Sequence, residues 1–304
     1  MTRARHPQTL QGAVSVSGRG LHGNRPCSVR LVPVSQASGL RFIHLPSATE
    51  IPVHASRAGD LQLATTLVSH GIRLQTVEHL LSALNGLEVE HLRIEVDGEE
   101  LPILDGSAAP WVEAIQAAGV QTLPGQRRFI QVLKPVEVGD GARGVRVSPF
   151  PGLRIRYTIE FEHPAIGRQT REMSLSPSKY RAELAAARTF CLAHEVEWMQ
   201  ARGLALGGSL ENAVVFGPQG PLNPEALRFQ DEAVRHKMLD LVGDLSLLGA
   251  PLLGLVEAHA AGHALHVALT QKLLAEPGAW AWSEAPEPSR VRPFPALVHH
   301  PVPA

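Results

Sequence analysis

Hydrophobic and polar positions alternate along the first 125 residues in ways that predict a mixture of strands and helices. The segment 27–32 places hydrophobic residues at every second position, which is the period of a strand. Over 76–84 the hydrophobic residues recur at helical spacing, and Thr76 is the expected N-cap. The expected elements are strands near 14–16, 27–32 and 92–96 and helices over 76–84 and 111–118.

The second half of the chain repeats this plan after a Pro-Gly segment at 124–128, which is the expected linker. The expected elements are strands over 129–137, 144–148, 153–161 and 252–258, helices over 177–188 and 231–248, and a short strand followed by a helix within 263–274. Seven prolines in 277–304 predict a poorly ordered tail. A shift of 157 residues places His79 on His236 and Gly86 on Gly243, but so few matches leave duplication and chance equally open.

Composition excludes several classes of protein. A net charge of −1 over 304 residues gives no basic footprint for nucleic acid. The most hydrophobic run, 245–258, is shorter than the roughly 20 residues that a membrane span needs. Two cysteines, Cys27 and Cys191, are too few for a disulfide framework, and we expect no secretory signal because no apolar stretch follows Arg3 and Arg5. These features predict a cytoplasmic protein of two domains that does not span a membrane.

Metal-ligand chemistry stands out in two distant segments. His236 and Asp240 are four residues apart, so they share one face of the expected helix, and His79 supplies a second imidazole. Two imidazoles and one carboxylate suit Zn²⁺ with a fourth position open for water. Glu78, next to His79, would be a general base, and the set indicates metal-assisted hydrolysis. A His-x-x-x-Asp pair is nevertheless common on surface helices, and the His-Glu-x-x-His signature is absent.

Further candidates each have an ordinary alternative. His263 follows a glycine and would be a general acid beside Asp244, or simply an exposed histidine. Lys237 would contact substrate or solvent, and the Thr189 hydroxyl would donate to an oxyanion or cap the chain. Phe190 opens an apolar segment that would line a passage for an acyl chain or join the core.

Seven motifs in order make the chain similar to the UDP-3-O-acyl-N-acetylglucosamine deacetylase (LpxC) family from about residue 8 to 275. They are Thr-Val-Glu-His-Leu at 76–80, Asp-Gly-Ser-Ala-Ala-Pro at 105–110, Phe-Glu-His-Pro-Ala-Ile at 161–166, Ala-Arg-Thr-Phe at 187–190, Leu-Gly-Gly-Ser at 206–209, Val-Arg-His-Lys-Met-Leu-Asp at 234–240 and Gly-His-Ala-Leu at 262–265. The resemblance implies an α+β fold of two similar domains, each a β-sheet packed against helices in a two-layer sandwich, with the active site between them. The implied domains are 1–126 and 127–276, with an acyl-passage insert near 190–216 and a Pro-rich tail over 277–304.

The family also implies an activity and its residues: zinc-dependent removal of the N-acetyl group of UDP-3-O-acyl-N-acetylglucosamine in lipid A biosynthesis, by a protein expected to be a monomer. One zinc ion is implied on His79, His236 and Asp240. The other implied roles are base for Glu78, acid for His263 with Asp244 beside it, oxyanion donor for Thr189, and substrate contact for Lys237 and Phe190. Ala260 and Ala261 stand where a basic residue can occur in the family, so Arg143 is a candidate for the diphosphate and Phe161 for stacking on uracil.

Two rival interpretations stay open at this point. One is a non-catalytic binder of a nucleotide or lipid precursor with a structural zinc ion, although such a site is normally closed by a fourth protein ligand. The other is a zinc amidase for a different acylated amino sugar. Acyl-chain length is not predicted, and iron or cobalt could use the same ligands.

Overall fold

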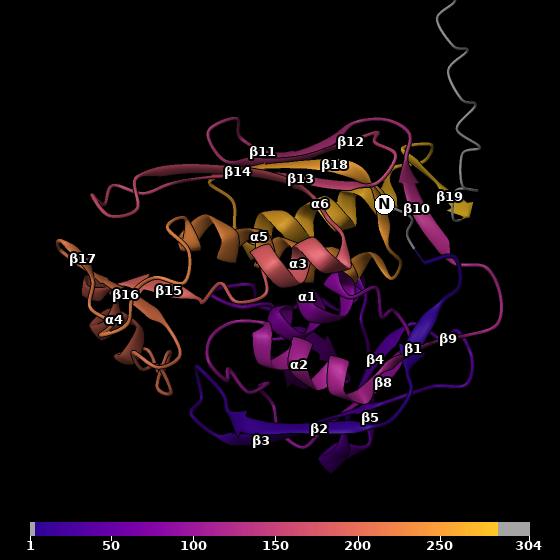
Figure 1. The fold of residues 1–304 in the computed structure, drawn as a ribbon, viewed down its shortest axis with the longest axis horizontal. Helices are drawn as coiled ribbons and strands as arrows, with labels where there is room; N and C mark the ends of the chain where they lie inside the picture. The colour runs from indigo at the N-terminus through magenta and orange to yellow at the C-terminus, as the bar shows by residue number, and fades with distance from the viewer. Residues whose placement is uncertain (1–3, 285–304) are drawn as a thin grey trace, which may run out of the picture.

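The computed structural model describes residues 4–284, a mixed α+β fold in which five main helices lie between two larger β-sheets (Figure 1). The strands of the first sheet are, in spatial order, β2 (Val14–Arg19), β3 (Pro26–Val32), β8 (Leu92–Val96), β4 (Leu40–His44) and β5 (Thr49–Pro52). Only the β8–β4 pair is parallel. Alternate residues of β3 are buried, as the period-2 pattern predicts.

The second sheet has the same strand order as the first. It runs β11 (Val136–Gly139), β12 (Gly144–Ser148), β18 (Leu252–His259), β13 (Leu153–Glu160) and β14 (Arg168–Ser174). In both sheets the fifth of these strands along the chain lies in the centre, and among the five it is parallel only to the third. In the second sheet this strand, β18, is also parallel to β10. β10 (Arg128–Val132) pairs with the start of β18, and β19 (Trp280–Glu284) pairs with β10.

The helices between the sheets are α1 (Glu78–Gly86), α2 (Ala109–Ala118), α3 (Pro177–Glu183), α5 (Glu232–Asp244) and α6 (His263–Ala275). α1 precedes the central strand of the first sheet, and α5 precedes that of the second. Ser82 donates to the Leu239 carbonyl at 2.7 Å and Asn85 to the Val242 carbonyl at 2.8 Å. Each pair is 157 residues apart, which is the shift of the sequence echo. Residues that the echo aligns therefore touch each other where α1 crosses α5.

Gly243 allows this close approach, and a second helix glycine, Gly86, allows a similar one between α1 and Tyr180 of α3. A Cβ on Gly243 would lie 2.2 Å from the backbone oxygen of Glu78, and a Cβ on Gly86 would lie 2.3 Å from the ring of Tyr180. The same shift of 157 residues aligns these glycines. Glycine lowers the stability of a helix by about 1 kcal/mol relative to alanine. Both positions therefore weaken their own helix but permit close contact with a neighbouring element.

Smaller elements complete the described chain. They are the strand pairs β1 (Gln8–Leu10) with β9 (Val120–Thr122) and β6 (Leu67–Ser69) with β7 (Ile72–Leu74), and a three-stranded sheet of β15 (Phe190–Leu192), β16 (Val214–Gly217) and β17 (Gly220–Pro221). This sheet and α4 (Ala193–Gln200) form a projection at the left of Figure 1.

The expected helix over 76–84 begins two residues late, and Thr76 is not its N-cap. The helix starts at Glu78, and the residue before it, Val77, makes no side-chain cap. Thr76 has a left-handed φ of 60°, and its hydroxyl donates to Glu100 at 3.2 Å. That conformation is unfavourable for a β-branched residue, so the surrounding contacts impose it.

Other expected elements end earlier than the sequence predicts. The strand over 129–137 is two strands, because Pro135 has no N–H for the sheet. The helix over 177–188 ends at Glu183, and that over 231–248 becomes a 3₁₀ turn after Asp244. The short strand expected within 263–274 is not formed, because the helix there starts directly at His263. Good helix formers such as Ala264 and Leu265 account for this.

The expected poorly ordered tail is wrong for its first part. Residues 280–284 form β19, and Trp280 packs against the hydrophobic core. The Arg128 guanidinium lies 4.1 Å from the ring centroid of Trp282. Bulky aromatic residues favour strands, and this signal outweighs Pro277 nearby. The remainder of that segment, 285–304, lies outside the described residues.

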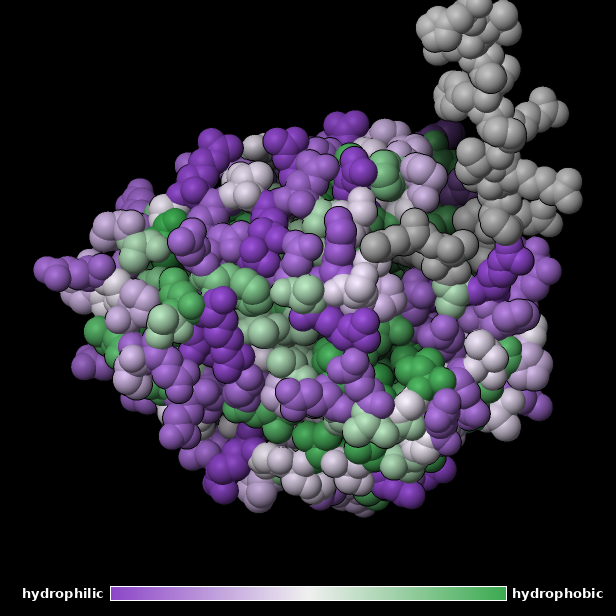
Figure 2. Space-filling model, viewed as in Figure 1, coloured by the Kyte–Doolittle hydropathy of each residue, from purple (hydrophilic) through white to green (hydrophobic). Residues whose placement is uncertain are grey.

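Hydrophobic side chains on the face shown in Figure 2 occur in separate groups between hydrophilic ones. Within residues 4–284, no helix is long and apolar enough to cross a membrane.

Replacing Gly243 by alanine should destabilise the protein although alanine is the better helix former. The added methyl meets the backbone of α1, which cannot rotate away, so we expect the free energy of unfolding to fall by about 1–3 kcal/mol. Gly152→Ala is the control, because a Cβ there meets only ordinary contacts of 3.7 Å or more with Phe150. Urea unfolding of both variants measures the difference, and equal stability would contradict the packing described for α1 and α5.

Candidate active site

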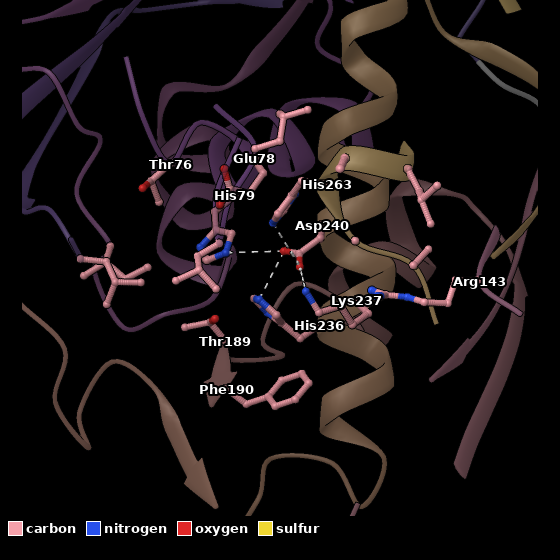
Figure 3. A pocket seen from close by; sticks show the side chains of 18 of the residues that line it. Thr76, Glu78, His79, Arg143, Thr189, Phe190, His236, Lys237, Asp240 and His263 are labelled. Carbon is pink, nitrogen blue, oxygen red and sulfur yellow. Dashed lines mark hydrogen bonds and ion pairs between the residues drawn. The ribbon is translucent and has the colours of Figure 1, made fainter. Parts of the chain in front are cut away.

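His79, His236 and Asp240 converge at the point where α1 meets α5. His79 comes from the first turn of α1, and the other two lie one turn apart on α5. The Oδ1 atom of Asp240 lies 3.3 Å from His236 Nε2 and 3.8 Å from His79 Nε2. All three side chains are buried and could together hold a metal ion (Figure 3).

The hydrogen bonding of this cluster fits a bound cation. His236 Nδ1 lies 3.1 Å from the Ala187 carbonyl oxygen, so its proton belongs on Nδ1 and the lone pair of Nε2 faces Asp240. Asp240 Oδ1 has no hydrogen-bond partner among the described residues. Burial, then the neighbouring His236, lowers the pKa of His79 to about 3, which disfavours an imidazolium there. His236 Nε2 and Asp240 Oδ1 are thus two acceptors that face each other, an arrangement that a cation between them stabilises, and this donor set suits zinc.

Glu78 lies beside this cluster in a buried position. Its Oε2 accepts a hydrogen bond from the backbone N–H of Thr65 at 2.9 Å. Burial raises the pKa of Glu78 to about 7, although the neighbouring His263 opposes that rise. A carboxyl group with a pKa near neutrality can both take up and release a proton at physiological pH.

His263 begins α6 and points toward Asp240 from the other side (Figure 3). Its Nδ1 donates to Asp244 Oδ2 at 2.8 Å, and its Nε2 lies 3.9 Å from Asp240 Oδ2. Burial alone would lower the pKa of His263, but the carboxylates, chiefly Asp244, outweigh it and raise the pKa to about 9. The imidazole is therefore protonated at neutral pH and able to donate from Nε2.

The segment before β15 is held against α5. The Arg188 side chain and backbone N–H both donate to the buried carboxylate of Glu232, at 2.9 and 3.0 Å. Thr189 donates its N–H to the Gly106 carbonyl at 2.8 Å. Gly106 has a φ of 82°, and a Cβ on it would lie 1.9 Å from the Asn212 oxygen, so the turn requires glycine. These contacts fix Thr189 beside His236.

A cavity of about 650 Å³ opens onto these groups. Of the residues predicted from the sequence, it is lined by Glu78, His79, Arg143, Thr189, Phe190, His236, Lys237, Asp240 and His263. Lys237 donates to Asp240 at 2.9 Å, and Arg143 donates to the Ala260 carbonyl at 2.9 Å. Asp244 does not line the cavity, because it lies behind His263. Phe161 does not line it either; its ring packs edge-on against that of Phe190, with the ring centroids 5.5 Å apart.

A second cavity of about 520 Å³ continues from the first under the projection of α4 and β15. Both cavities share Leu21, Leu63, Thr189 and Phe190 in their walls. Most of its further lining is apolar, including Cys191, Val196, Trp198, Met199, Leu210, Ala213 and Val215.

Three buried residues of this region were missed by the sequence analysis. Thr65 contacts Glu78 and Asp244, and His266 donates to Asp244 Oδ2 at 2.8 Å. The Tyr157 hydroxyl lies 2.9 Å from His266 Nε2. His266 is three residues after His263 in a helix, so this spacing was the one available signal.

Comparison with known sequences decides the family of this chain. The family model described as UDP-3-O-acyl N-acetylglycosamine deacetylase (LpxC) matches residues 7–275. The chain belongs to this family.

Curated relatives agree over nearly the full length of the LpxC-family chain. A UDP-3-O-acyl-N-acetylglucosamine deacetylase of Anaeromyxobacter dehalogenans is 43% identical over 297 residues, which is 96% of each chain. One from Anaeromyxobacter sp. (strain Fw109-5) is 44% identical over 89% of each chain. A third, from Syntrophotalea carbinolica, is 41% identical over 93% of this chain and 92% of its own. The family resemblance stated from the sequence is thus confirmed.

We expect the purified protein to bind one zinc ion per chain and to lose it when Asp240 is replaced by alanine. This change removes the oxygen that both imidazoles approach, and two histidines alone bind zinc weakly. Elemental analysis after dialysis measures the metal content. His194→Ala, which removes an exposed histidine on α4, is the control and should retain the ion. Full zinc content in Asp240→Ala would place the metal elsewhere.

Proposed function

We propose that this chain hydrolyses the N-acetyl group of UDP-3-O-acyl-N-acetylglucosamine, releasing acetate, as a step in lipid A biosynthesis. The observation that carries the proposal is the arrangement around Asp240: a buried metal-ligand cluster with Glu78 and His263 on either side, in a cavity continuous with an apolar one. A purely structural zinc site has no need of these two groups. The curated relatives bear the name of this activity.

His79, His236 and Asp240 would hold a zinc ion, which supplies a Lewis acid for the amide carbonyl and a water molecule of lowered pKa. The Glu78 carboxylate would take a proton from the attacking water, because it is buried in the cavity wall beside the cluster. The backbone N–H of Thr65 holds this carboxylate in place through Oε2.

The leaving amine requires a proton, and His263 would supply it from Nε2. Its opposite nitrogen is tied to Asp244, which fixes the ring and keeps it charged. Thr189 would donate its hydroxyl to the oxyanion of the tetrahedral intermediate, since its backbone is fixed at the rim of the cluster. Proton acceptor and proton donor thus approach the amide from opposite sides.

Substrate binding would use both cavities. Lys237 and Arg143 place positive charge in the first, which suits the sugar and the diphosphate. The second would take the acyl chain, because most of its lining is apolar and Phe190 stands at the junction. Phe161 remains our candidate for stacking on uracil, although it lies outside the first cavity and supports Phe190.

We further propose that the chain forms two similar domains, 1–126 and 127–276, with the insert near 190–216 and the active site between them, in a monomer. The shared strand order of the two sheets supports this division. So do the two hydrogen bonds that join residues 157 apart.

The decisive experiment is acetate release from UDP-3-O-acyl-N-acetylglucosamine by the purified protein. We expect turnover that is lost on chelation and restored by zinc, because the ligand set suits that ion. Free N-acetylglucosamine serves as the control substrate and should react slowly, since it lacks the diphosphate for the charged cavity and the acyl chain for the apolar one. Zinc-loaded protein that releases no acetate would contradict the proposed function.

Glu78→Gln and His263→Gln should each lower kcat by about 10²–10⁴-fold, because each removes one proton transfer. Both substitutions conserve approximate size, so zinc content and substrate affinity should change little. Steady-state kinetics with metal analysis of the same samples provides the measurement. Near-native turnover in both variants would refute the assigned division of roles.

Cys191→Phe tests the proposed acyl passage. The larger ring fills the apolar cavity at a position that lines it, so KM for a long-chain substrate should rise by about tenfold, the equivalent of losing roughly two buried methylene groups. A substrate with a 3-O-acetyl group should be turned over as by the wild type. An equal effect on both substrates would place the acyl chain elsewhere.

A further inference from the structure

Thr65 uses all three of its polar groups to join separate parts of the site. Its N–H donates to Glu78 Oε2 at 2.9 Å, its hydroxyl donates to Asp244 Oδ1 at 2.6 Å, and its carbonyl accepts from the N–H of Val77 at 3.3 Å. The same hydroxyl lies 3.1 Å from His263 Nδ1. Thr65 is fully buried, so water does not replace these partners.

The carboxylate of Asp244 is the convergence point of these contacts. Oδ2 accepts from His263 and from His266, each at 2.8 Å, and Oδ1 accepts from Thr65. The two imidazoles alone would leave Oδ1 unbonded and the carboxylate free to rotate about its bond to Cβ. The third donor removes that freedom, and the His263 ring is held only as firmly as the oxygen that binds it.

We propose that Thr65 is a positioning residue that sets the proton acceptor and the proton donor of this site in one geometry. It acts on Glu78 through its backbone and on His263 through Asp244. This inference rests on the proposed function, because it assigns the two groups their roles in amide hydrolysis. No contact of Thr65 with substrate is required.

The neighbouring Thr66 provides a matched comparison. It is also buried, but its hydroxyl has no hydrogen-bond partner among the described residues. A threonine that serves only to pack would resemble Thr66. Thr65 differs from Thr66 because its hydroxyl donates to Asp244 and its backbone N–H donates to Glu78.

The test replaces each threonine by valine, which keeps the shape and the backbone N–H and removes only the hydroxyl. We expect Thr65→Val to lower kcat by about 10- to 100-fold with KM unchanged, as for other losses of a supporting hydrogen bond. Thr66→Val should match the wild type. Thr65→Ser should recover most of the rate, and Thr65→Ala should not. These last two differ by one hydroxyl and decide the question if the valine variant does not fold.

A second measurement does not depend on turnover. The His263 Nδ1 proton, bonded to a carboxylate, should resonate downfield of the amide region in the proton NMR spectrum, with His263→Gln identifying the signal. Thr65→Val should shift or broaden it, and Thr66→Val should leave it unchanged. If the wild type releases no acetate, the proposed function fails and this spectrum still decides the role of Thr65. An unchanged signal, a kcat equal to that of the wild type, or equal losses in both valine variants would overturn the inference.

Discussion

The contact between α1 and α5 is the constraint on which the rest of the structure depends. The two helices approach until the backbone of Gly243 touches the carbonyl of Glu78, which no residue with a Cβ would permit. That distance brings His79 within reach of Asp240 although 161 residues separate them in sequence. Wider spacing would still bury both helices but would leave three isolated polar side chains in an apolar interior, at a considerable cost in free energy.

Electrostatics around Asp240 and Asp244 then separates the roles of similar groups. Burial raises the pKa of both carboxyl groups, Glu78 and Asp244, and it dominates at Glu78; at Asp244 the charge of His263 and the hydrogen bonds from His263 and His266 together outweigh burial and lower the pKa. His79 and His263 diverge in the same way, because His263 has a carboxylate partner and His79 has another imidazole beside it. The environment of each side chain, and not its residue type, therefore determines whether it is protonated.

Much of this arrangement is readable in the sequence, for identifiable reasons. The i, i+4 spacing of His236 and Asp240 and the period-2 pattern of β3 are local signals, and they correctly predicted that the two side chains lie together on one helix and that the strand lies at 27–32. Contacts between distant segments produce no such local pattern in the sequence. Thr65 sits in an ordinary Ala-Thr-Thr sequence, and its importance comes from Asp244, 179 residues away. The sequence predicts Thr76 as an N-cap for the same reason, because the contact with Glu100 that holds it in a strained conformation comes from a distant segment.

The order in which the chain is synthesised gives the α1–α5 contact a further consequence. The α1 side chains that bond to α5, Ser82 and Asn85, leave the ribosome well before α5 exists to accept their hydrogen bonds. At a typical synthesis rate of about 5–20 residues per second, they wait roughly eight to thirty seconds for their partners. The α1 side of the helix contact therefore stays open while the second half is made, and a metal ion could be held by all three residues of the cluster only after Asp240 has been added.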